Sequence, residues 1–259
     1  MKFYTYGNIE NPPIMLLAGT WCLHTSFNEV IPLLQKSFYV IAVSYDGFDE
    51  TEDGVFFDML TETEKIESYI KENYGGRLFA AYGCSLGGSF VGLLVQRNNI
   101  HIEHGFIGSS DLDQSGKIKA WLMTKLFGGM MVKMLQTGKY PWYMKKGFEK
   151  NLQTEYGRKF YEMLGIGKGG YPFIKKESAE NQFYSDLIMP LDEQISADGT
   201  TIHVFYAQKM GEKYLERYHK HFKNPHIVTH DLRHEELLIR YPEKWVNELE
   251  ICCFRRKEK

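Results

Sequence analysis

Short apolar segments alternate with longer segments of helical period along most of the chain. Segments rich in β-branched and aromatic residues predict strands at residues 12–19, 38–46, 77–83, 103–110, 200–208 and 225–232. Amphipathic segments predict helices at residues 27–36, 61–76, 86–99, 212–222 and 234–254, the last interrupted near Pro242. Strands that are apolar throughout and separated by helices indicate a mostly parallel sheet with helices on both faces. The sequence therefore predicts an α/β fold.

The alternation stops between residues 111 and 199, where tryptophans, tyrosines, glycines and many methionines occur without strand signals. Because no repeat or low-complexity linker borders this segment, we interpret it as an insertion over one edge of the sheet. Residues 1–110 and 200–259 are then the two parts of one core, and residues 111–199 are a helical cap.

Composition narrows the classes of function. A chain of 259 residues fits a single sizeable core, and a formal net charge of −2 with mixed signs offers no basic face, so we expect no nucleic-acid partner. No apolar run approaches ~20 residues, and no basic segment leads into an apolar one at the start, so we expect neither a spanning helix nor a signal peptide, and a cytoplasmic location. The four cysteines lack C-x-x-C spacing, which predicts reduced thiols and no zinc site.

The segment "AAYGCSLGGSF" surrounds Ser85 with small residues where a predicted strand turns into a predicted helix. Only small residues let a strand and a helix approach closely enough for such a turn. Ser85 would then lie at its apex with the hydroxyl exposed above the sheet, and the N–H of Leu86 would lie at a positive helix start. Ser85 is therefore the candidate nucleophile, and a tight turn without chemistry is the alternative.

With this motif the sequence resembles the α/β-hydrolase superfamily over nearly its whole length. The resemblance rests on "GCSLG", on "LLAGTW" after an early strand, on the interrupting insertion and on a histidine after the last strand. It implies that the loop after the early strand donates a second N–H to an oxyanion hole. Here Ala18-Gly19 replaces the usual histidine-glycine pair, which leaves Thr20 as the donor by position beside Leu86.

A serine hydroxyl needs a base to accept its proton. His234 follows the last predicted strand, where the family keeps its base, and His230 is the fallback. Three other histidines of this region, His219, His221 and His226, fall on a predicted surface helix and loop, and no H-E-x-x-H pattern occurs. We therefore expect them to be solvated and the site to hold no metal.

The carboxylate that should orient the histidine has three candidates in the sequence. The family places it after the strand before the last, where this sequence has Met210 and the nearest acid is Glu212. Asp111 follows the preceding strand and is a second candidate, with helix capping as its alternative role, and Asp231 is a third. Glu212 is our first prediction, although a glutamate at a helix start is also favoured by the helix dipole alone.

These residues predict a serine hydrolase of the carboxylesterase type that cleaves esters of small apolar acyl groups without a cofactor. The alternatives are an acyltransferase or thioesterase using the same serine, and a slow or non-catalytic ligand-binding homologue. Methionines and aromatic residues in the cap suit a lid over an apolar pocket. Lysines interleaved with them leave open a contact with a membrane surface, although no membrane association is our first expectation.

Overall fold

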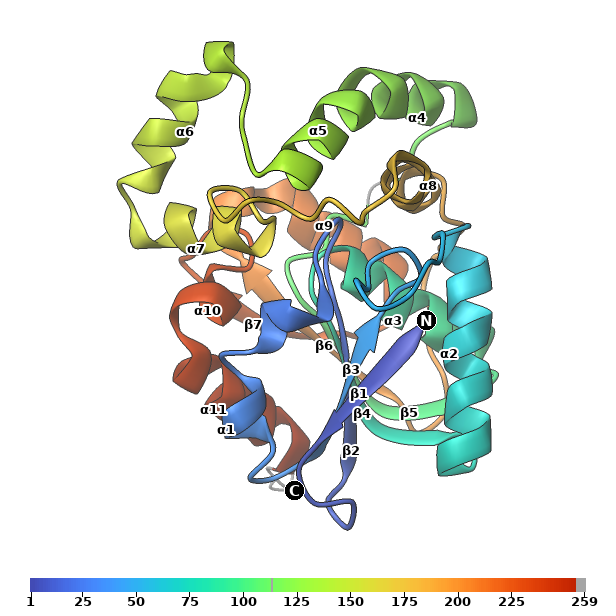
Figure 1. The fold of residues 1–259 in the computed structure, drawn as a ribbon. Coiled ribbons are helices and arrows are strands. Elements are labelled where there is room, and N and C mark those ends of the chain that lie inside the picture. The colour runs from blue at the N-terminus through green and yellow to red at the C-terminus, as the bar shows by residue number, and fades with distance from the viewer. Residues whose placement is uncertain (113, 255–259) are drawn as a thin grey trace.

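The computed structural model describes residues 1–112 and 114–254, and its centre is a seven-stranded sheet (Figure 1). The strands are β1 (Lys2–Tyr6), β2 (Pro13–Leu17), β3 (Tyr39–Ser44), β4 (Arg77–Gly83), β5 (His101–Ile107), β6 (Thr201–Ala207) and β7 (His226–His230). They lie in the order β1-β3-β2-β4-β5-β6-β7, and every pair is parallel except β1 with β3. The predicted α/β class and mostly parallel sheet are confirmed.

Helices cover both faces of this sheet, which explains why its strands are apolar throughout. The core helices are α1 (Ile31–Leu34), α2 (Met59–Tyr74), α3 (Leu86–Arg97), α9 (Glu212–His221), α10 (Glu236–Arg240) and α11 (Pro242–Phe254). The side chain of Asp58 caps the first turn of α2 by accepting from the Thr61 N–H, and Gly75 ends that helix in a left-handed conformation. These local signals fix the bounds of α2.

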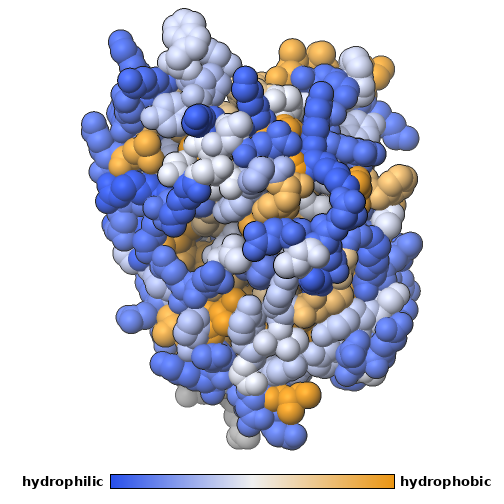
Figure 2. Space-filling model, viewed as in Figure 1, coloured by the Kyte–Doolittle hydropathy of each residue, from blue (hydrophilic) through white to orange (hydrophobic). Residues whose placement is uncertain are grey.

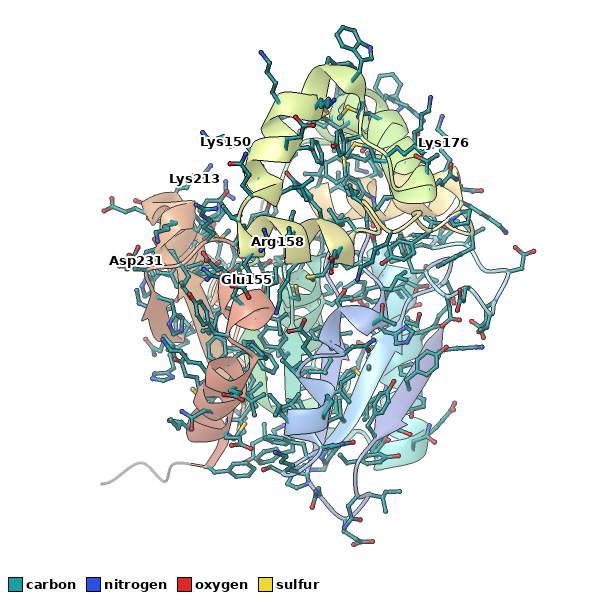
Figure 3. The ribbon with its side chains drawn as sticks, turned by 60° about the vertical axis from the view of Figure 1, so that its left-hand side comes forward. Lys150, Glu155, Arg158, Lys176, Lys213 and Asp231 are labelled. Carbon is teal, nitrogen blue, oxygen red and sulfur yellow. The ribbon has the colours of Figure 1, made fainter. Side chains whose placement is uncertain are left out.

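The segment between β5 and β6 is helical and stands beyond the C-terminal ends of the strands (Figure 1). It holds α4 (Lys117–Met123), α5 (Gly129–Thr137), α6 (Lys145–Leu152), α7 (Glu155–Met163) and α8 (Lys176–Leu187). We call residues 117–187 the cap segment. It rests on the core in part through α7, whose Glu155 is labelled in Figure 3. The Glu155 carboxylate forms an ion pair with Arg240 of α10 at 3.1 Å.

The cap segment also carries a group of exposed apolar side chains. Figure 2 shows hydrophobic atoms at the top of the molecule, as well as further hydrophobic patches among the hydrophilic atoms of the same face. The exposed large apolar residues of α4 and the turn after it are Ile118, Trp121, Leu122, Leu126 and Phe127. Within the described part of the chain, no helix is long and apolar enough to cross a membrane.

Several elements differ from their predicted form. The sequence pattern gave no indication of β1, an antiparallel edge strand in which three of the five residues are aromatic. The predicted helix 27–36 is only the four residues of α1, preceded by a short 3₁₀ turn. The last predicted helix is divided at Tyr241, and Pro242 starts a new helix. Proline suits this first position, because a backbone N–H there would have no acceptor within the helix. The charged residues 255–259 lie outside the described residues.

Candidate active site

Ser85 occupies a strained turn between β4 and α3. Its φ is 50° and its ψ is −113°, a region that residues with a side chain rarely adopt. The flanking glycines allow the turn, since a Cβ on Gly83 would lie 2.0 Å from the backbone of Gly87, and a Cβ on Gly87 would lie 2.1 Å from the carbonyl oxygen of Leu17. The close approach predicted from the small residues is therefore what the backbone requires.

His234 reaches Ser85 from the loop between β7 and α10. Its Nε2 lies 3.1 Å from the Ser85 Oγ, within hydrogen-bond distance. The loop is held from the cap side, where the Tyr156 hydroxyl donates to the His234 carbonyl at 2.9 Å. The ring of Phe160 also meets the imidazole edge to face, with centroids 6.4 Å apart. The first contact holds the backbone of the loop, and the second packs the cap segment against the imidazole.

Glu235 is a buried residue beside the site that the sequence did not single out. Its side chain is buried, with one carboxylate oxygen accepting from the N–H groups of Ser85 at 2.9 Å and Ser109 at 2.6 Å. The other oxygen accepts from the Tyr82 hydroxyl at 2.8 Å. The same residue adopts a left-handed φ of 53°, which sets the path of the chain next to His234. Glu235 thus ties the serine turn and the histidine loop together.

The buried carboxylate of Glu235 also affects its neighbours. Burial, reinforced by the negative charge of Glu235, raises the pKa of Tyr82 and of the Cys84 thiol well above their usual values. Both groups therefore stay protonated at neutral pH. The cysteine beside the serine is consequently not a competing thiolate nucleophile.

The three predicted carboxylates are exposed in the structure. Glu212 is the first residue of α9, and Asp111 follows β5. Asp231 forms an ion pair with Lys209 at 3.5 Å, and 81% of its side chain is exposed. Figure 3 labels Asp231 at the edge of the molecule. Among the hydrogen bonds and ion pairs found within residues 1–112 and 114–254, none joins a carboxylate to the imidazole of His234. The orienting acid remains a prediction.

The other four histidines between residues 219 and 230 form no hydrogen bond to Ser85 among the contacts of the described residues. His230, the fallback base, ends β7 and places its Nε2 2.7 Å from a carboxylate oxygen of Glu248 in α11. His219 and His226 are exposed as expected. The expectation for His221 is wrong, because its ring is buried and its Nδ1 lies 2.8 Å from the Asp192 carbonyl oxygen. The helical period correctly placed His221 in a helix, but it did not predict that this residue lies on the buried side of α9.

The loop after β2 lies against the serine turn and is fixed by the cap segment. The N–H of Trp21 donates to the Gln182 side chain at 2.6 Å, and its indole N–H donates to the Ala179 carbonyl at 2.9 Å. The backbone hydrogen bonds that residues 1–112 and 114–254 form in turns, loops and helix caps do not include one donated by the N–H of Thr20 or of Leu86. These two predicted donors therefore have capacity left for an oxygen atom of a bound molecule.

Ser85 opens into an apolar cavity of about 310 Å³ between the core and the cap segment. Ser85 and His234 share its wall with side chains of both parts, chiefly aromatic residues and methionines. The cap contributes Met131, Met134, Met144, Phe148, Phe160, Tyr161, Met163, Leu164 and Ile166. This volume is at the lower end of the range for small-molecule sites, which favours a small apolar ligand.

Solved structures with the same architecture decide the fold. An α/β-hydrolase enzyme from a deep-sea metagenome library, MGS-M2, has a TM-score of 0.72 at 11% identity, covering 100% of this chain and 95% of that one. The chain has the α/β-hydrolase fold. A protein assigned to that family from Desulfitobacterium hafniense matches at a TM-score of 0.76 and 15% identity, over 97% and 99% of the two chains. The enol-lactonase of Burkholderia xenovorans matches at 0.63 and 14%, over 96% and 94%.

Similarity in sequence is more restricted. No model of a protein family matches the chain. Two human proteins, serine hydrolase-like protein and serine hydrolase-like protein 2, are each 29% identical to it over 91 residues. The matched segment is 33% of this chain and 45% and 29% of the two relatives, so it spans less than half of either.

Proposed function

We propose that the chain is a serine hydrolase that cleaves carboxylic esters of small apolar acyl groups through an acyl-enzyme. The observation that carries the proposal is the 3.1 Å approach of the His234 Nε2 to the Ser85 Oγ at the wall of an apolar cavity. Two N–H groups, of Thr20 and Leu86, are the proposed oxyanion donors. No cofactor enters the reaction. The four cysteines are free, which suits a reducing compartment such as the cytoplasm.

The proposed reaction has two halves. The Ser85 oxygen attacks the ester carbonyl while its proton passes to His234, and the resulting oxyanion accepts hydrogen bonds from the two N–H groups. The carbon–oxygen bond to the alcohol then breaks, and the leaving oxygen takes the proton from His234. Water next attacks the acyl-enzyme with its proton passing to His234, and that proton returns to Ser85 as the acid leaves.

A non-catalytic or slow ligand-binding protein is the second candidate. It is favoured by the lack of a carboxylate beside His234 among the described contacts, because an imidazole without such a partner is a weaker base. Both candidates use the same cavity. They differ in whether Ser85 is reactive.

Labelling with a fluorophosphonate probe distinguishes them. We expect the protein to be labelled on the peptide that contains Ser85, and Ser85→Ala to remove both labelling and hydrolysis of short-chain p-nitrophenyl esters. The thermal midpoint should stay close to that of the wild type, because the substitution deletes only a partly buried hydroxyl. Ser68→Ala is the matched control, since its hydroxyl is exposed on α2 and bonds only the Glu64 carbonyl. Labelling that persists in Ser85→Ala would overturn the assignment.

We propose Glu212 as the carboxylate that orients His234, because it follows β6, the strand before the last. Glu212→Gln should then lower kcat by about two to four orders of magnitude with little change in stability, as loss of the orienting carboxylate does in other triads. Asp111→Asn and Asp231→Asn are the matched controls and should cost little. Steady-state kinetics on one ester checks this order, and a larger loss in either control would move the acid to that residue.

A further inference from the structure

Three histidines and a cysteine gather away from Ser85, near the N-terminal ends of β6 and β7. His203 Nδ1 lies 3.2 Å from His226 Nδ1, and the Cys252 Sγ lies 4.0 Å from the same His226 atom. The three donor atoms all lie within 4.8 Å of one another. His226 begins β7, whereas His234 follows its other end, and four residues of strand alone span ~13 Å. The cluster is therefore separate from the serine site.

The surroundings of His203 favour a ligand role for its Nδ1. His203 Nε2 lies 3.1 Å from the Nδ1 of His104, whose Nε2 faces the Glu103 carboxylate at 3.9 Å. A proton on the His104 Nε2, toward Glu103, makes the His104 Nδ1 an acceptor for the His203 Nε2–H. The lone pair of His203 is then on Nδ1 and faces His226. Metal-bound histidines are commonly oriented in this way, by a partner on the other ring nitrogen.

The spacing of the donors suits a tetrahedral ion. With zinc–nitrogen bonds of about 2.0–2.1 Å, two nitrogens of a tetrahedral site lie roughly 3.3 Å apart, and a nitrogen and a sulfur roughly 3.6 Å apart. The nitrogen pair is at 3.2 Å, the sulfur has to approach the His226 nitrogen by about 0.4 Å, and it lies within 4.8 Å of the His203 nitrogen, so binding requires the Cys252 side chain to move toward both imidazoles. His203 is buried, while His226 is exposed and Cys252 is partly exposed, so an ion has a route from solvent.

We propose that His203, His226 and Cys252 bind one zinc ion, with water as the fourth ligand. Two imidazoles and one thiolate are a donor set that zinc favours, and the thiol proton passes to solvent on binding. The ion would join β6, β7 and α11, so its role is to hold the C-terminal helix on the sheet. The C-x-x-C rule predicted no zinc site because it detects only ligands that are close in sequence.

Cobalt titration of the full, tag-free, reduced and chelator-treated protein tests the proposal. We expect one Co²⁺ per chain with a thiolate-to-cobalt charge-transfer band, displacement of that band by Zn²⁺, and a higher thermal midpoint with Zn²⁺ present. Absence of the band in the wild type would overturn the proposal and leave the histidines as a hydrogen-bonded chain.

Variants locate the ion. Cys252→Ser should abolish the band and weaken Zn²⁺ binding at least tenfold, and His226→Ala, at an exposed position, should weaken binding similarly without unfolding the chain. Cys253→Ser is the matched control, being the adjacent thiol outside the cluster, and should bind as the wild type does. Equal loss in Cys253→Ser, or undiminished binding in Cys252→Ser and His226→Ala, would overturn the site. Ser85 labelling should be the same with and without the ion, which keeps this test independent of the proposed hydrolase.

Discussion

At the scale of single residues, Glu235 links the two reacting groups of the proposed hydrolase. It is the neighbour of His234 in the chain, and its carboxylate accepts the N–H of Ser85. A buried carboxylate is stable only when its oxygens are hydrogen-bonded, and three donors meet this need. We therefore regard Glu235 as a positioning residue for both groups.

Glu235→Gln should lower kcat at least tenfold while KM changes little. Both carboxylate oxygens of the wild type accept hydrogen bonds, so the amide NH₂ of glutamine would replace one acceptor and face a group that is itself a donor. Stopped-flow and steady-state kinetics, normalised to the fraction of protein labelled by the fluorophosphonate, measure the effect. Glu236→Gln is the matched control. That glutamate is also buried but accepts from the Arg233 N–H and from Arg240, so its loss should lower stability without a matching loss of kcat. Equal effects in both variants would assign Glu235 a structural role alone.

At the scale of elements, the site depends on how closely α3 approaches β2 and β4. Gly87 of α3 lies against the carbonyl oxygen of Leu17 in β2, and this contact sets where Ser85 stands above the sheet. The glycine spacing predicted this approach from sequence. A position that has no room for a side chain must be occupied by glycine, and glycine can be recognised in the sequence. Neither β1 nor Glu235 was visible in the same way. β1 depends on pairing with β3, and Glu235 reads in "HEELL" as an ordinary residue at a helix start.

Gly87→Ala should be strongly destabilising. Its Cβ would lie 2.1 Å from a backbone oxygen that cannot move aside, so the helix must shift, at a cost of about 1–3 kcal/mol, and Ser85 with it. Gly92→Ala in the same helix is the control, because its Cβ would meet only side-chain ends of Leu191 and Phe222 at 3.2–3.3 Å. Thermal unfolding and ester hydrolysis of both variants check the expectation. A Gly87→Ala protein as stable and active as the wild type would show that the approach is not required.

At the scale of the whole molecule, the proposed pocket is shared between core and cap segment. The core supplies Ser85, His234 and the loop after β2, and the cap segment supplies most of the apolar wall. The sequence predicted a methionine-rich lid but not which methionines face the cavity. Met131 and Met134 line the cavity, whereas Trp121 on α4 is 56% exposed and lies outside it. Which side chains of the cap helices face the cavity depends on how these helices pack on the core. The helical period alone does not predict that packing.

Met134→Ala should therefore shift the preferred ester toward longer acyl chains. The side chain is 2% exposed and lines the cavity, so its truncation leaves space that a longer chain can fill, while the protein loses about 2–5 kcal/mol of stability. Hydrolysis of a series of p-nitrophenyl esters, each expressed as kcat/KM relative to the butyrate, separates the shift in preference from the general loss of folded protein. Trp121→Ala, an exposed aromatic residue of the same cap segment, is the control and should leave the chain-length profile unchanged. If Met134→Ala lowers all esters by the same factor, the methionine acts in packing only, and the chain-length limit lies in the core half of the pocket.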